Sequence, residues 1–169
     1  RGKPLVYLDN GATTQKPQQV IDTIDRYYRQ HNANVHRAAH ELAEEATALL
    51  EECRNKAQAF LNAAHRESMI FTRGTTEGIN LVAQVIEDKI QAGQDIVISQ
   101  LEHHSNIVPW QLLAQRTGAN IKAIDIDEHG DLDLASAASL ITENTALLAI
   151  THISNGLGSV NPVANLVEQ

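Results

Sequence analysis

The stretch Ile96-Val97-Ile98-Ser99-Gln100-Leu101-Glu102-His103-His104 joins a short β-branched apolar run to a strongly polar segment. Similar short apolar runs occur at Met69–Thr72, Ile121–Ile126 and Leu147–Ile150. The segments between these runs are long enough for crossover helices, which we expect over 77–91, 106–117 and 134–141. Short strands that alternate with helices indicate a parallel sheet. We therefore predict an α/β fold with a mostly parallel sheet and flanking helices.

The sequence pattern in the first part of the chain is typical of helices joined by irregular loops. A proline opens a periodic segment at Pro17–Tyr28, and Glu41–Leu61 carries apolar residues at spacings of three and four. We expect both segments to be helices. Cys53 lies on the apolar stripe of the longer one, so we expect its side chain to be buried. We also expect Trp110 to serve packing, and Gly93 and Gly118 to end helices.

Composition excludes several classes of protein. The 169 residues are 43% hydrophobic and 20% charged, which is ordinary for a globular domain. The formal net charge of −8 and the lack of a basic cluster argue against a nucleic-acid surface. Because there is a single cysteine, an internal disulfide is excluded and a reducing compartment is favoured. The sequence has no apolar run of about 20 residues, so we expect no membrane span and a cytoplasmic location.

Three polar loops follow the predicted strands. They begin at Arg73, Glu102 and Thr151, within three residues of the ends of the runs at Thr72, Ser99 and Ile150. Ligands of open α/β sheets collect at the carboxyl ends of the strands. We therefore expect a binding site at this edge of the sheet.

The first loop, Gly74-Thr75-Thr76, admits two interpretations. Free backbone N–H groups at a helix start, with two hydroxyls, are suited to a phosphate. The alternative is simple capping, with Thr76 as the N-cap residue. The loop lacks both the Gly-Lys-Ser/Thr of a Walker loop and the GxGxxG dinucleotide pattern. ATP and NAD are therefore not expected.

The histidines also leave more than one interpretation open. An imidazole at position 103 or 104 can stack on a flat ring or move protons near neutral pH, or it can simply be structural. A zinc site would need three or four ligands. The histidine donors available would be His36, His40, His103, His104 and His152. His36 and His40 lack the glutamate of the HExxH pattern, and we expect no metal site.

Five segments occur together in one order along the chain. They are Tyr7-Leu8-Asp9-Asn10-Gly11-Ala12-Thr13-Thr14, Asn34-Val35-His36-Arg37, Phe71-Thr72-Arg73-Gly74-Thr75-Thr76-Glu77-Gly78-Ile79-Asn80-Leu81-Val82-Ala83, Glu102-His103-His104-Ser105-Asn106-Ile107-Val108-Pro109-Trp110-Gln111 and Thr151-His152-Ile153-Ser154-Asn155. Together they resemble the group II (SUF-system) cysteine desulfurases and selenocysteine lyases of the class V aminotransferase family. The resemblance runs from Leu5 to Val163.

This resemblance implies a fold and a cofactor. The fold would be that of fold type I enzymes dependent on pyridoxal 5'-phosphate (PLP), cut short within the large domain. Residues 1–64 would form an N-terminal segment with active-site loops and a long helix, and residues 65–169 the first part of the PLP-binding domain. The rest of that domain and the C-terminal small domain would be absent. We therefore expect exposed apolar helix faces and unpaired strand edges.

The resemblance also implies roles for particular residues. Thr75 and Thr76 match the phosphate cradle for PLP. His103 matches the histidine that stacks on the pyridine ring and helps proton transfer, and Asn155 matches the asparagine near the phenolic oxygen of the ring. The loops beside the substrate would be formed by Asn10, Gly11, Ala12, His36 and Arg37, the last two often across a homodimer.

The activity implied is removal of sulfur from L-cysteine, or of selenium from L-selenocysteine, leaving L-alanine. The sulfur would pass through an enzyme persulfide to a sulfur-acceptor protein for iron–sulfur cluster assembly. The family's Schiff-base lysine and nucleophilic cysteine lie downstream of residue 169. Neither Cys53 nor the lysines at positions 3, 16, 56, 89 and 122 match them. We expect these 169 residues alone to be inactive. Another class V PLP enzyme and a non-catalytic binding scaffold are the alternatives.

Overall fold

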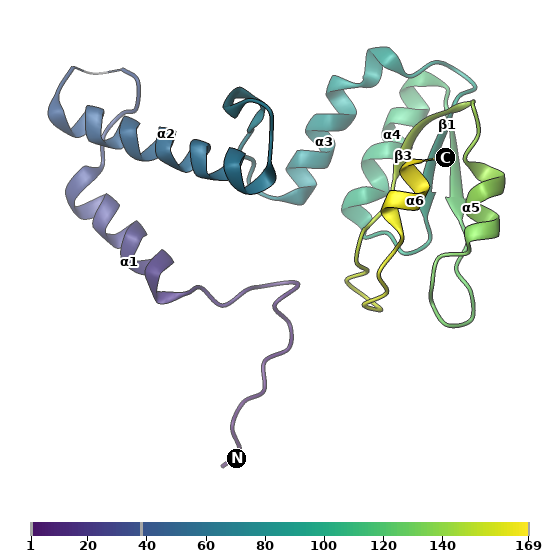
Figure 1. The fold of residues 1–169 in the computed structure, drawn as a ribbon, viewed down its shortest axis with the longest axis horizontal. Coiled ribbons are helices and arrows are strands. Elements are labelled where there is room, and N and C mark those ends of the chain that lie inside the picture. The colour runs from purple at the N-terminus through teal and green to yellow at the C-terminus, as the bar shows by residue number, and fades with distance from the viewer. Residues whose placement is uncertain (1, 38, 169) are drawn as a thin grey trace. The chain divides into compact units, whose positions relative to one another are not determined.

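The computed structural model describes residues 2–37 and 39–168 (Figure 1). The chain divides into two compact units, Arg1–Phe71 and Thr72–Gln169. Among the described residues, no helix has the length and apolar character needed to cross a membrane.

The first unit is helical. It contains α1 (Gln18–Arg26), a π-helical turn η1 (Tyr27–His31), α2 (Glu41–Leu61) and a 3-10 turn η2 (Arg66–Ser68). The imidazole Nδ1 of His40 accepts the N–H of Ala43 at 3.2 Å and so caps the start of α2. At its other end α2 stops at Asn62, which adopts the left-handed conformation. The bounds predicted for α2 are confirmed.

The apolar faces of this unit are largely uncovered. Only Ala43 and Ala46 of α2 are buried, because α2 packs mainly against η1 and η2. Cys53 is exposed, so the prediction that it is buried is wrong. Large apolar side chains that stay exposed include Ile21, Ile24, Tyr28, Leu42, Leu49 and Phe60. The expectation of exposed apolar helix faces is confirmed here.

The second unit is built on a parallel sheet. Its strands β1 (Asp95–Ser99), β2 (Asn120–Ile124) and β3 (Thr145–Ala149) lie in the order β2-β1-β3. β1 pairs in parallel with both neighbours. All five residues of β1 are buried, as expected for a central strand covered on both faces. The predicted α/β class and parallel sheet are confirmed.

Helices cover both faces of this sheet (Figure 1). They are α3 (Thr75–Val85), α4 (Val108–Thr117), α5 (Leu134–Leu140) and α6 (Val163–Val167), with 3-10 turns η3 (Glu87–Lys89) and η4 (His104–Asn106). Successive strand residues point to opposite faces. Ile96 and Ile98 therefore join a cluster with Trp110, whereas Val97 joins a second cluster with Leu166. Trp110 packs in the core, as predicted.

Of the expectations about α3, Gly118 and Gly93, two need correction and one is confirmed. α3 begins at Thr75 and ends at Val85, earlier than predicted at both ends. Gly118 ends α4 with a φ of +77°, as predicted. Gly93, whose φ is +83°, instead lies in the turn before β1, because α3 has already given way to the 3-10 turn η3.

Residues 69–72 form no strand, so the fourth predicted strand is wrong. In the described chain the strand ladder joins only β1, β2 and β3, and a strand needs a hydrogen-bonded neighbour. The segment is attached to α2 instead. Arg54 donates to the carbonyl of Met69, and its guanidinium carbon lies 5.4 Å from the centroid of the Phe71 ring. Ile70 and Phe71 are exposed.

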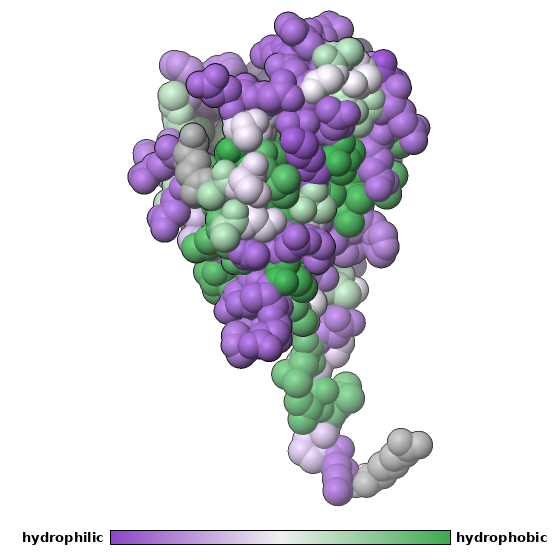
Figure 2. Space-filling model, turned by 90° about the vertical axis from the view of Figure 1, so that its right-hand side faces the viewer, coloured by the Kyte–Doolittle hydropathy of each residue, from purple (hydrophilic) through white to green (hydrophobic). Residues whose placement is uncertain are grey.

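The surface of the second unit also carries apolar side chains. Leu134, Leu157 and Val160 are exposed. Figure 2 shows apolar side chains between hydrophilic ones on one face of the molecule. The expectation of exposed apolar surface therefore holds in both units.

Candidate functional site

Gly74 shapes the entry into α3. It has a φ of +155° and a ψ of −179°, a conformation that is open almost only to glycine. The chain therefore arrives extended and turns at once into the helix, so that Thr75 and Thr76 are its first two residues. Gly74, which has no side chain, occupies the N-cap position. The alternative in which Thr76 is the N-cap is therefore wrong.

The first turn of α3 presents backbone donors. The first intrahelical hydrogen bond runs from the N–H of Gly78 to the carbonyl of Gly74 at 3.0 Å. The N–H groups of residues 75–77 precede it and have no acceptor within the helix. Residues 73–77 line a cavity of about 430 Å³. This arrangement of N–H groups and two hydroxyls suits a phosphate, since a helix N-terminus favours negative charge.

The side chain of Glu77 ties this turn to the preceding loop. Its Oε2 accepts the N–H of Arg73 at 2.5 Å. The carboxylate thereby accepts from a donor outside the helix rather than from the N–H groups of Thr75 and Thr76. The loop is thus held in place without occupying the donors that a phosphate would use.

His103 and Asn155 come from two neighbouring strands. His103 follows β1 and Asn155 follows β3, and these strands are paired in parallel. Both residues line one cavity of about 330 Å³, together with Glu102, His104 and Ser154. Their meeting at the carboxyl edge of the sheet agrees with the expectation from the sequence. Their roles toward a cofactor stay a prediction.

The His103 imidazole has a defined orientation. Its Nδ1 accepts the backbone N–H of Ser105 at 3.2 Å and lies 2.9 Å from the hydroxyl oxygen of the same residue. A backbone N–H only donates, so Nδ1 is the unprotonated nitrogen of the neutral ring. Nε2 then carries the proton. Because the side chain is exposed, Nε2 is the atom available to exchange a proton with a bound molecule.

The two threonines and the His103–Asn155 pair line separate cavities of the second unit. α3 nevertheless packs against η4, which begins directly after His103. The structure therefore brings His103 and Asn155 together, and it places the start of α3 on an element that contacts their loop. Convergence of all four side chains on one ring stays a prediction.

The other candidate residues belong to the first unit. Asn10, Gly11 and Ala12 form an exposed turn closed by bonds from the N–H groups of Ala12 and Thr13 to the carbonyl of Asp9, at 3.2 and 3.0 Å. This turn is self-supporting. The predicted place of these three residues beside a substrate stays a prediction.

His36 is held by α2. It has a φ of +58°, and its N–H donates to the hydroxyl of Thr47 at 3.0 Å. Its Nε2 lies 3.2 Å from Oε1 of Glu51. The backbone at His36 is therefore fixed in a rare conformation just before Arg37, which is exposed. The predicted contact of both residues with a substrate stays a prediction.

The structure shows a hydrogen-bond network around Glu102, next to His103, that was not predicted from the sequence. Oε1 of Glu102 accepts the hydroxyl of Ser99 at 2.6 Å and the N–H of Thr151 at 2.7 Å, and Oε2 accepts Nδ2 of Asn106 at 2.7 Å. Oδ1 of Asn106 accepts the indole N–H of Trp110 at 2.8 Å. The sequence does carry a signal, because polar residues recur at spacings of three and four after a buried strand.

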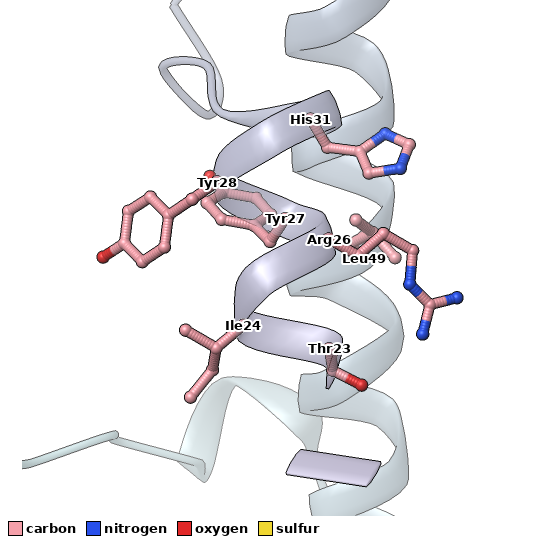
Figure 3. A pocket seen from close by; sticks show the side chains of 7 residues that line it. All are labelled: Thr23, Ile24, Arg26, Tyr27, Tyr28, His31 and Leu49. Carbon is pink, nitrogen blue, oxygen red and sulfur yellow. The ribbon is translucent and has the colours of Figure 1, made fainter. Parts of the chain in front are cut away.

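A larger cavity lies elsewhere. In the first unit, α1, η1 and α2 line a hollow of about 630 Å³ whose side chains include Ile24, Tyr27, His31 and Leu49 (Figure 3). None of the predicted site residues lines it. Among residues 2–37 and 39–168, no group of three or more His, Cys, Asp or Glu side chains is arranged to hold a metal ion.

Known proteins resemble the chain over nearly its whole length. A probable cysteine desulfurase of Mycolicibacterium paratuberculosis is 51% identical over 99% of the chain, and one of Streptomyces coelicolor is 49% identical over 99%. The chain spans only 24% and 41% of these two relatives. The apo structure of a cysteine desulfurase from Thermococcus onnurineus NA1 matches with a TM-score of 0.90 and 39% identity, over 96% of this chain and 40% of that one. Residues 6–169 match the model of the class-V aminotransferases, and the chain belongs to that family.

Proposed function

We propose that the natural protein containing this chain is a PLP-dependent cysteine desulfurase. The observation that carries the proposal is the identity of 51% and 49% to proteins with that name, over 99% of the chain. In the reaction, L-cysteine and an enzyme thiol give L-alanine and an enzyme persulfide. The bond from sulfur to the β-carbon breaks, a sulfur–sulfur bond forms, and the β-carbon takes up a proton.

Within the chain, α3 would hold the cofactor phosphate. PLP, when bound, supplies an electron sink for the amino acid's α-carbon. The N–H groups of Thr75 and Thr76 and their two hydroxyls would bind the phosphate oxygens. The positive end of the helix dipole supports this charge. The open cavity at residues 73–77 is consistent with the fit.

His103 and Asn155 would hold the cofactor ring. The imidazole would stack on the ring face, and its Nε2 would exchange a proton with the bound substrate. The side-chain amide of Asn155 would donate to the phenolic oxygen of the ring. Support comes from the cavity that both residues line and from the bonds that fix Nδ1 of His103.

The two loops of the first unit would border the substrate. Asn10, Gly11 and Ala12 would lie beside the amino acid, and His36 and Arg37 would reach the site across a homodimer. We further propose L-selenocysteine as a second substrate. A sulfur-acceptor protein would be the partner, iron–sulfur cluster assembly the destination of the sulfur, and the cytoplasm the location.

The proposal is tested on the natural protein with L-cysteine and a thiol reductant. We expect alanine and sulfide in equal amounts, and an absorbance band from bound PLP. Sulfide without alanine would point to another class V reaction, and the absence of both PLP and product would overturn the proposal.

A matched pair of variants tests the phosphate cradle. Thr75→Val with Thr76→Val removes two hydroxyls but keeps the branched shape, so PLP should bind about 10- to 100-fold more weakly. Thr23→Val, at an exposed position of α1, should leave the dissociation constant unchanged. Equal affinities of the three proteins would remove the threonines from the cofactor site.

A further inference from the structure

We propose that Glu102 is a positioning residue, whose carboxylate fixes His103 and Asn155 relative to each other. This inference rests on the proposed function, because it concerns the same cofactor site. Glu102 lies next to His103 in the chain and also lines the cavity. Its carboxylate forms hydrogen bonds with residues of both loops. It thereby joins the loop after β1 to the loop after β3.

The bond from the N–H of Thr151 to Oε1 of Glu102 makes this link. It joins two residues 49 positions apart and lies where both loops leave the sheet. On its other side, Thr151 uses its carbonyl to accept Nδ2 of the buried Asn161 at 2.7 Å. Both backbone polar groups of Thr151 are therefore held. The chain from Thr151 to Asn155 starts from a fixed point.

The same carboxylate holds the loop that carries His103. Ser99, which donates to Oε1, is 1% exposed, and Asn106, which donates to Oε2, is fixed by Trp110, which is 3% exposed. Glu102 therefore connects His103 to two anchors in the core. Without the Glu102 carboxylate, the loop that carries His103 and the loop that carries Asn155 would move independently of each other.

The donors and acceptors of this network permit only one arrangement. An indole N–H only donates, so the carbonyl oxygen of Asn106 must face Trp110 and its NH₂ group must face Glu102. The hydroxyl of Ser99 and the N–H of Thr151 also donate to Glu102. All three partners of Glu102 are thus donors, and a carboxylate accepts all of them.

Because all three partners donate to Glu102, a substitution that introduces a donor at this position tests the network in the natural protein. Glu102→Gln keeps the shape but turns an NH₂ group toward one of the three donors. In cofactor-free protein, the amides of residues 103–106 and 151–155 should then exchange hydrogen about tenfold faster or more. With PLP bound, the visible circular dichroism of the cofactor should weaken. The kcat should fall by up to about 100-fold while KM changes little, since displaced groups lose reactive geometry.

A second substitution should restore the network. In Glu102→Gln with Asn106→Asp, the new amide NH₂ donates to the new carboxylate, which also accepts the indole N–H of Trp110. The new amide oxygen accepts from Ser99 and Thr151. The total charge equals that of the original protein. The double variant should recover exchange protection, cofactor dichroism and kcat, whereas Asn106→Asp alone should lose them by placing two carboxylates face to face.

Glu143→Gln is the charge-matched control, because Glu143 is exposed in the turn before β3. It should leave all three measurements unchanged. Unaltered hydrogen exchange in Glu102→Gln, or a double variant no better than the singles, would overturn the positioning role. Failure to bind PLP or to form alanine would instead overturn the proposed function, and the exchange measured without cofactor would still decide the role of Glu102.

Discussion

Nζ of Lys122 on β2 lies 2.8 Å from Oδ2 of Asp95, the first residue of β1. Asp95 is 2% exposed, and its carboxylate also accepts the side-chain amides of Asn120 and Asn144, at 3.3 and 3.1 Å. One carboxylate therefore joins the beginnings of all three strands. The loops that carry His103 and Asn155 follow the opposite ends of β1 and β3, so the Asp95 network lies away from the proposed cofactor site.

Asp95 should make stability depend on pH. The hydrogen bond from Lys122 holds the pKa of this carboxyl below its usual range. A carboxyl with a lower pKa in the folded state stabilises the fold above its unfolded pKa, about 4. That contribution is lost as the pH falls through the folded-state pKa. The free energy of unfolding of the natural protein, measured in urea, should therefore fall more between about pH 6 and about pH 3 than that of Asp95→Asn.

The control for this prediction is Asp88→Asn, which removes the same charge from an exposed position of η3. Its pH profile should run parallel to that of the original protein. If the pH profile of Asp95→Asn also runs parallel to that of the original protein, the ion pair of Asp95 and Lys122 does not cause the loss of stability in acid.

Gly74→Ala should damage the start of α3. A side chain at a φ of +155° is strained, at a cost of about 1–3 kcal/mol in the free energy of unfolding. Gly78→Ala is the matched control within the same helix, where the new methyl would meet only the Thr72 hydroxyl oxygen at 3.6 Å. It should raise stability by about 0.5–1 kcal/mol, because alanine is the better helix former. Equal effects of the two variants would refute the special backbone at Gly74.

Two adjacent leucines of α4 test the placement of the core. Leu113 is fully buried at 0% exposed, whereas Leu112 is 45% exposed. Leu113→Ala should therefore lower the free energy of unfolding by about 2–5 kcal/mol, since it leaves a cavity among well-packed neighbours. Leu112→Ala should cost far less. Chemical denaturation measures both losses in the free energy of unfolding. Equal or reversed losses would contradict this placement of the core.

The histidine pair offers a test of the proposed chemistry. His103→Gln should retain PLP but lower kcat by about 10²- to 10⁴-fold, the range for loss of a general acid–base group. His104→Gln removes the neighbouring ring, whose centroid lies 5.6 Å from that of His103 and which is nearly perpendicular to it. It should keep most of the activity. A larger loss in His104→Gln would exchange the roles assigned to the two residues.

Local patterns in the sequence were sufficient where neighbours in the chain determine the structure. The bounds of α2 and the end of α4 at Gly118 follow from periodicity and capping. The strands at Ile96, Ile121 and Leu147 follow from short runs of β-branched or aliphatic residues. His103 and Asn155 could be placed at one edge because parallel strands end on the same side.

The remaining features depend on partners that are distant in the chain. Residues 69–72 read as a strand, yet they have no neighbour in the described sheet and contact Arg54 instead. Cys53 lies on an apolar stripe that its own unit leaves partly uncovered. The role of Glu102 depends on the N–H of Thr151, which no local pattern predicts.

The most direct test of the central claim is a crystal structure of the natural protein with PLP bound. The phosphate should lie at the N–H groups and hydroxyls of Thr75 and Thr76, with the ring against the His103 imidazole and its phenolic oxygen at the Asn155 amide. PLP bound without contact to any of these four residues would contradict the account.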